Sequence, residues 1–131
     1  MRYVLDTHAA IWLVEDAPQL GGRARAALGK LRGEDLVISD VTLSELARLL
    51  QTSKVTVTGD PLFVLEAFAQ RFQVQAVSPW IAWRAATYDW AHRDPADRHI
   101  LATAEFLGLT LVTVDAAITP FAPSVGVAVV W

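Results

Sequence analysis

The stretch RYVLDTH (residues 2–8) joins a short apolar run to a polar turn that begins with an acid. Residues 2–5 read as a short buried strand, and residues 9–15 have the apolar spacing of a helix that stops before Pro18. A strand followed at once by a helix is the repeating unit of folds in which strands and helices alternate. In such folds ligands bind at the carboxyl ends of the parallel strands, and Asp6 stands at such an end.

The rest of the chain repeats this alternation. Further buried strands are predicted over residues 36–38, 74–77, 109–114 and 125–130. Helices are predicted over residues 23–32, 41–50, 61–72, 80–90 and 95–107, with start or stop signals at Gly33, Ser39, Asp40, Asp60, Pro61, Ser78, Pro79, Asp94, Pro95 and Gly108. We therefore expect one three-layer α/β domain over residues 1–131, with a mainly parallel central sheet flanked by helices.

Composition narrows the classes of function. A chain of 131 residues with 53% hydrophobic content suits a single domain, and a net charge of -3 argues against binding nucleic acid through bulk positive charge. The absence of cysteine excludes disulfides and thiolate metal sites. The first apolar run breaks at Asp6, too early for a signal peptide, and no segment approaches the roughly 20 apolar residues of a membrane span. We expect a cytoplasmic protein.

Four acids, Asp6, Glu45, Asp97 and Asp115, stand where strands end or where helices begin or present a flank. Two unit charges about 4 Å apart repel by roughly 4 kcal/mol at an effective dielectric of about 20. Such a cluster needs a positive partner, and a hard divalent cation with oxygen ligands is the simplest candidate. The four acids are therefore the candidate metal site.

Each acid also has a structural interpretation. Asp6 could serve simply as the N-cap of the following helix. Asp115 could likewise cap the weak helical segment that Pro120 interrupts. Glu45 could be solvated, but it lies on the flank of an apolar stripe and can aim at the strand ends. Asp97 could complete a capping box with Asp94, whereas capping accounts fully for Asp94 itself.

The three histidines, His8, His92 and His99, fit no zinc motif, and we expect them to be structural or peripheral, although His99 could hydrogen-bond substrate. The motifs of serine hydrolases, P-loop NTPases and dinucleotide enzymes are also absent.

Four motifs occur in order: VLDTHA (4–9), SDVTLSELA (39–47), DPADRHILATA (94–104) and LVTVD (111–115). Together they resemble the PIN-domain ribonucleases over nearly the whole chain, and most closely the VapC toxins of prokaryotic toxin-antitoxin pairs. The resemblance implies a PIN-like fold and places the family's acidic quartet on Asp6, Glu45, Asp97 and Asp115.

The resemblance also implies Mg²⁺ or Mn²⁺ as cofactor, single-stranded RNA as substrate, a cognate VapB-like antitoxin and a homodimer. Thr7, Ser39 and Thr113 match small polar positions that line the family's cleft. Arg98 could contact a substrate phosphate, although an exposed helix arginine is the simpler interpretation. The last motif reads TVD where many members have TRD or TND, and Ala116 replaces a polar residue, which weakens the assignment of Asp115.

Two other functions stay open from sequence. A magnesium phosphatase would need a second aspartate two residues after its nucleophile, but Asp6 is followed by Thr7 and His8. A non-catalytic protein-binding module would not need all four acids. One further expectation concerns assembly: Trp80, Trp83, Tyr88 and Trp90 are predicted on one helix, as a contact for a second copy or the antitoxin.

Overall fold

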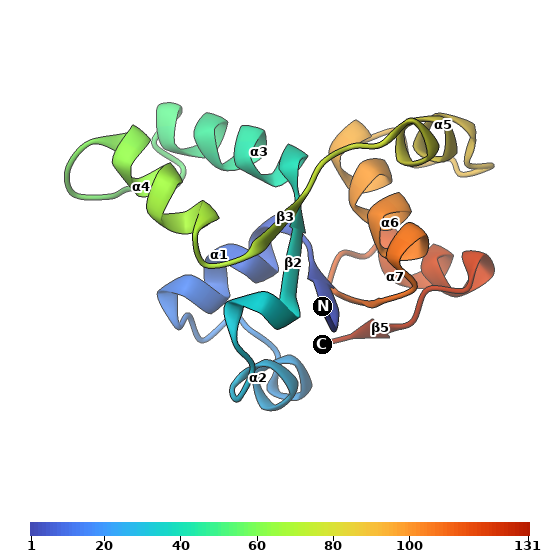
Figure 1. Cartoon of the computed structure of the whole chain (residues 1–131), viewed down its shortest axis with the longest axis horizontal. Coiled ribbons are helices and arrows are strands. Elements are labelled where there is room, and N and C mark those ends of the chain that lie inside the picture. The colour runs from blue at the N-terminus through green and yellow to red at the C-terminus, as the bar shows by residue number, and fades with distance from the viewer.

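The computed structural model describes residues 1–131 and is built on a five-stranded sheet in the order β3-β2-β1-β4-β5. The strands are β1 (Tyr3–Leu5), β2 (Leu36–Ser39), β3 (Gln73–Gln75), β4 (Thr110–Val112) and β5 (Val129–Val130). Every strand pair is parallel, and β1 is the central strand (Figure 1). The expected parallel α/β sheet is therefore confirmed.

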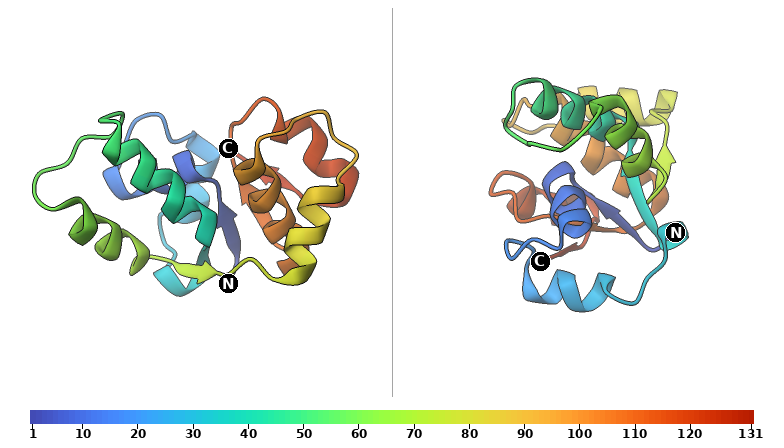
Figure 2. Two further views of the ribbon diagram at one scale, coloured as in Figure 1. Left: turned by 90° about the horizontal axis from the view of Figure 1, so that it is seen from above. Right: turned by 90° about the vertical axis from the view of Figure 1, so that its left-hand side faces the viewer.

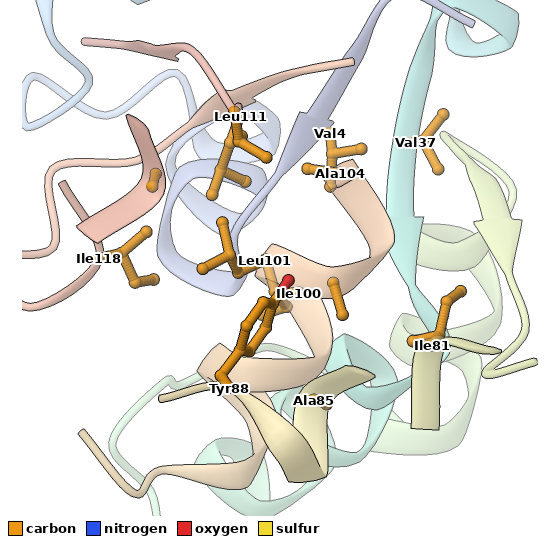
Figure 3. Packing of buried hydrophobic residues seen from close by; sticks show 13 residues of the cluster. Val4, Val37, Ile81, Ala85, Tyr88, Ile100, Leu101, Ala104, Leu111 and Ile118 are labelled. Atoms are coloured by element: carbon orange, nitrogen blue, oxygen red, sulfur yellow. The ribbon is translucent and has the colours of Figure 1, made fainter. Parts of the chain in front are cut away.

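The sheet carries a separate core on each face because side chains alternate along a strand. Val4 pairs with Val37 and Leu111, and these three side chains face one cluster of 13 buried residues (Figure 3). Their neighbours Leu5 and Val112 belong to a second cluster of 13 on the opposite face. These two apolar faces require helices on both sides, which gives the three layers.

Helices α1 (Thr7–Glu15), α2 (Gly22–Leu28), α3 (Asp40–Gln51) and α4 (Pro61–Ala69) cover the face of Leu5. Helices α5 (Pro79–Thr87), α6 (Pro95–Leu107) and α7 (Ile118–Phe121) cover the face of Val4. Two 3₁₀ turns, η1 (Gly33–Asp35) and η2 (Ala122–Val125), lead into β2 and toward β5. Figure 2 shows α3 and α6 on either side of β1.

Several predicted element ends were wrong. Helix α2 ends at Leu28 rather than at Gly33, which instead opens η1. Helix α5 ends at Thr87, so Tyr88 and Trp90 lie in the following loop and not on the helix with Trp80. The predicted last strand, residues 125–130, is mostly 3₁₀ turn and coil, because only its last two residues reach β4. None of the helices is both long and apolar enough to span a membrane.

Candidate metal centre

Asp6 follows β1 directly and is held from two sides. Its Oδ1 accepts a hydrogen bond of 2.8 Å from the backbone N of Ala9, which caps α1, and its Oδ2 accepts one from the hydroxyl of Thr113. The residue is only 8% exposed. Burial raises the pKa of Asp6 above its usual value, the nearby charge of Asp115 adds to this, and the two hydrogen bonds oppose it. Asp6 thus combines the capping role with a buried carboxylate at the strand end.

Thr113 and Asp115 follow β4, the neighbour of β1. The backbone N of Asp115 donates to Thr113 Oγ1 at 3.0 Å, so this hydroxyl links the two carboxylate-bearing turns. Asp115 Oδ1 accepts from the backbone N of Ala117 at 2.8 Å and of Ile118 at 3.0 Å. The other oxygen of Asp115 makes no hydrogen bond and is free to bind a ligand.

Glu45 reaches the site from the flank of α3, as its place beside the apolar stripe predicts. The residue is half-buried, and its Oε1 accepts a hydrogen bond from the hydroxyl of Thr7, next in sequence to Asp6. Thr7 Oγ1 also lies 3.2 Å from Thr42 Oγ1. Ser39 is fully buried, and its hydroxyl caps α3 by accepting from Val41 N at 3.3 Å. Thr7 therefore touches an acid, whereas the hydroxyl of Ser39 serves the helix.

Asp97 lies in the first turn of α6, with a side chain that is 19% exposed. Burial raises its pKa to about 6, the charges of Asp94 and Asp115 add to this rise, and a hydrogen bond with His92 opposes it. Asp94 is exposed and accepts from Ala96 N and Asp97 N at 2.9 and 3.3 Å. Asp94 is therefore the helix cap that the sequence predicts.

The acids come together at the carboxyl edge of the sheet. The charge of Asp115 acts on both Asp6 and Asp97, and Glu45 is joined to the residue beside Asp6. No lysine or arginine forms an ion pair with any of the four. The tightest group of potential ligand atoms is a different trio, His92, Asp94 and Asp97, whose atoms lie within 4.8 Å of one another. The donor set is thus rich in carboxylate oxygen and lacks a lysine or arginine counterion, which fits a hard divalent cation.

His92 is the residue that sequence reasoning missed. Its Nε2 lies 2.7 Å from Asp97 Oδ2, so the ring fixes one oxygen of the carboxylate and leaves the other free. His92 stands in the loop between α5 and α6, five positions before its partner, where no helical or strand period applies. From the sequence we expect His92 to be structural or peripheral, and nothing in the sequence predicts its contact with Asp97.

Arg98 also has a role different from the two that were considered. Its guanidinium is half-buried and donates to the main-chain carbonyl of Ala85 at the end of α5 and to those of Tyr88, Trp90 and His92 in the loop that follows. It is not an exposed helix arginine, and its donors are already used. Arg98 instead holds the loop that carries His92 to Asp97.

The sequence profile of the PIN domain matches residues 3–121. The chain belongs to the PIN domain family. Its relatives include Ribonuclease VapC22 of Mycobacterium tuberculosis, 29% identical over 113 residues, 86% of this chain and 85% of the relative. This match confirms the family resemblance found in the four motifs.

Solved structures agree with the fold of this PIN domain. The structure of FitAcB from Neisseria gonorrhoeae is 26% identical, with a TM-score of 0.63 over 97% of this chain and 95% of that chain. A toxin-antitoxin complex from Klebsiella pneumoniae is 25% identical, with a TM-score of 0.66 over 98% and 96%. DNA-bound VapBC from Salmonella typhimurium has a TM-score of 0.72 at 23% identity, over 99% and 97% of the chains, and supports the fold alone.

Proposed function

We propose that this PIN domain is an endoribonuclease that depends on Mg²⁺ or Mn²⁺ and cuts single-stranded RNA, as the toxin of a VapBC-type pair. One observation carries the proposal: buried Asp6 and partly buried Asp97 have raised pKa values, both feel the charge of Asp115, and no lysine or arginine pairs with either of them. The relatives that are ribonucleases or belong to toxin-antitoxin complexes support the substrate and the role.

Each of the four acids has a role in the proposed reaction. Asp6 and Asp97 would be the principal ligands. Ala9 N and the Thr113 hydroxyl hold the two oxygens of Asp6, and His92 holds one oxygen of Asp97. Glu45 and Asp115 would bind the ion through water or position the attacking water. When bound, a divalent cation lowers the pKa of water, polarises the phosphoryl oxygen and offsets the charge of the transition state. No side chain has to form a covalent intermediate.

The alternatives receive no comparable support. A phosphatase would need an acid where His8 stands, and His8 is exposed on α1, where its ring lies 5.6 Å from that of Trp12. A binding module without catalysis would not need to keep unneutralised carboxylates buried, because their mutual repulsion destabilises the fold. We also propose a VapB-like antitoxin and a second copy of the chain as partners, in the cytoplasm.

Two variants of the DPAD motif test this proposal. Asp97→Asn should leave a stable protein, because it relieves repulsion in the metal-free cluster, and should abolish cleavage of a single-stranded RNA in Mg²⁺ or Mn²⁺. Asp94→Ala should lower the free energy of unfolding by about 0.5 to 2 kcal/mol through loss of the helix cap. Its folded fraction should still cleave.

The matched control is Asp60→Asn, a change at the exposed N-cap of α4. It should leave cleavage unchanged, and a chelator should stop cleavage by the wild-type protein. Near-normal cleavage by Asp97→Asn, together with loss of cleavage by a fully stable Asp94→Ala, would show that Asp94 and not Asp97 is the ligand from this motif.

A further inference from the structure

Two hollows meet over the start of α6. The first, of about 330 Å³, is lined by Glu45 of the metal centre and by Arg48, one turn further along α3. The second, of about 590 Å³, lies toward the α5–α6 loop and is lined by residues that include Arg93. Pro95 and His99 line both hollows. The two hollows are therefore neighbours over the start of α6, and together they are called the groove, which has Glu45 in its wall.

The groove holds two arginines that the fold does not use. Arg25 pairs with Asp16, Arg84 pairs with Glu105, and Arg98 is occupied by main-chain carbonyls. Arg48 and Arg93, by contrast, are exposed and form neither an ion pair nor a side-chain hydrogen bond. In a chain with a net charge of -3, two free guanidinium groups in neighbouring hollows indicate local recognition of an anion.

The aromatic rings in this groove are not available for stacking on bases. One face of Trp90 stacks on Phe121, with centroids 4.6 Å apart and planes inclined by 5°, and the guanidinium of Arg98 lies 5.8 Å from the Trp90 ring centre. Tyr88 is buried and meets Phe121 edge-on. The free groups of the groove are therefore charges, which recognise a phosphate backbone rather than base identity.

We propose that the backbone of the single-stranded RNA lies across the start of α6, with one phosphate against Arg48 and another against Arg93. This inference rests on the proposed ribonuclease function. It adds the path along which the RNA leads away from the metal centre. His99 lines the hollows of both arginines, and its Nδ1 contacts the Pro95 carbonyl, so that Nε2 is the ring nitrogen left to face a phosphate. Asp89 lines the same groove and opposes phosphate binding.

The test measures the binding of a fluorescent oligouridine in the Asp97→Asn background, so that RNA is held and not cut. Each phosphate contact to a single strand contributes about 0.7 to the slope of log affinity against log salt. Arg48→Gln and Arg93→Gln should each raise Kd several-fold and reduce this slope by about 0.7. Asp89→Asn should act in the opposite direction and lower Kd.

Arg23→Gln is the matched control, because Arg23 is equally exposed but lies on α2, at the far side of the molecule from α5 and α6 (Figures 1 and 2). It should leave Kd and slope unchanged. Melting curves confirm that all variants are folded. In the otherwise wild-type protein, Arg48→Gln and Arg93→Gln should raise KM for RNA cleavage with little change in kcat.

Two results would overturn the groove as the RNA path. In the first, the two arginine variants bind oligouridine like the Arg23 control while the wild-type protein cleaves RNA. In the second, the arginine variants weaken binding of poly-glutamate but not of RNA, which would make the groove a protein contact. Absence of any metal-dependent cleavage by the wild-type protein would instead refute the proposed ribonuclease function itself.

Discussion

Asp97 is the residue whose ionisation most directly links the site to stability. Its pKa of about 6 in the folded protein exceeds its ordinary value of 3.8. At pH values between these two pKa values the folded chain holds more protons than the unfolded chain. The free energy of unfolding therefore falls as pH rises. We expect the metal-free protein to lose unfolding free energy from about pH 4 to about pH 6, and Asp97→Asn to flatten this dependence.

Urea denaturation at a series of pH values, in the presence of a chelator, measures this effect. Asp6, whose pKa is also raised, contributes in the same direction, so the Asp97→Asn curve keeps a residual slope. Because a metal ion binds the deprotonated carboxylate, affinity for Mn²⁺ should rise through the same pH range. An Asp97→Asn curve with the wild-type slope would show that Asp97 titrates normally.

The places of Asp6, Glu45 and Asp115 at strand ends or on a helix flank could be predicted from sequence, but the contact of His92 with Asp97 could not. Asp6 and Asp115 directly follow strands, and Glu45 lies on the flank of an apolar stripe. These local patterns indicate that the three side chains point toward the carboxyl ends of the strands. The place of His92 depends instead on contacts that no period encodes: the Arg98 hydrogen bond to its carbonyl and the ring of Trp90, 5.0 Å from its own. Its role follows from tertiary packing.

At the scale of elements, Arg98 joins α6 to the end of α5 and the loop that follows. Lysine keeps the charge but lacks the planar fork that serves several carbonyls at once. Arg98→Lys should therefore lower the free energy of unfolding by about 2 kcal/mol or more, since hydrogen bonds from a charged donor contribute about 1.5–3 kcal/mol each. It should also weaken Mn²⁺ binding, because His92 would no longer be held against Asp97.

Urea denaturation and a Mn²⁺ titration check the two effects separately. Arg93→Lys is the control, because Arg93 is exposed and holds no carbonyl, so its replacement should change neither quantity. Loss of stability with unchanged Mn²⁺ affinity would mean that the loop does not position Asp97.

Helix starts were predicted better than helix ends. Pro61, Pro79 and Pro95 each begin a helix as expected, because proline at the first turn and a capping side chain before it act locally. The end of α5 has no such local signal, and the chain leaves the helix at Tyr88, whose ring enters the core. Burial of Tyr88 in the core therefore determines where α5 ends, and the sequence pattern alone does not predict that end.

At the scale of the whole molecule, metal should stabilise the folded chain by mass action. The ion binds the assembled cluster and not the dispersed chain, so a concentration 100 times Kd should add about 2.7 kcal/mol to the free energy of unfolding. Thermal melts in millimolar Mn²⁺ measure the shift, and Asp6→Asn should remove most of it. A melting temperature that is unaffected by Mn²⁺ would contradict the metal centre.

The outer surface of α5 and α6 is the place where we predict contact with a second copy. Trp83 is 74% exposed, and Trp80 packs against Phe106 with centroids 5.5 Å apart while both stay exposed. Trp83→Arg should shift the protein from dimer to monomer in sedimentation, and Trp12→Phe, a change away from this surface, should not. A wild-type monomer at high concentration would contradict the prediction.

The hydrogen bond from Thr113 to Asp6 joins residues 107 positions apart in the chain. During translation β1 emerges early but has to wait for β4 before its acid meets its partners. At about 5–20 residues per second, this delay lasts from roughly five to twenty seconds. Throughout that interval the nascent polypeptide lacks this contact of the proposed metal centre, so we expect it not to degrade the message from which it is being made.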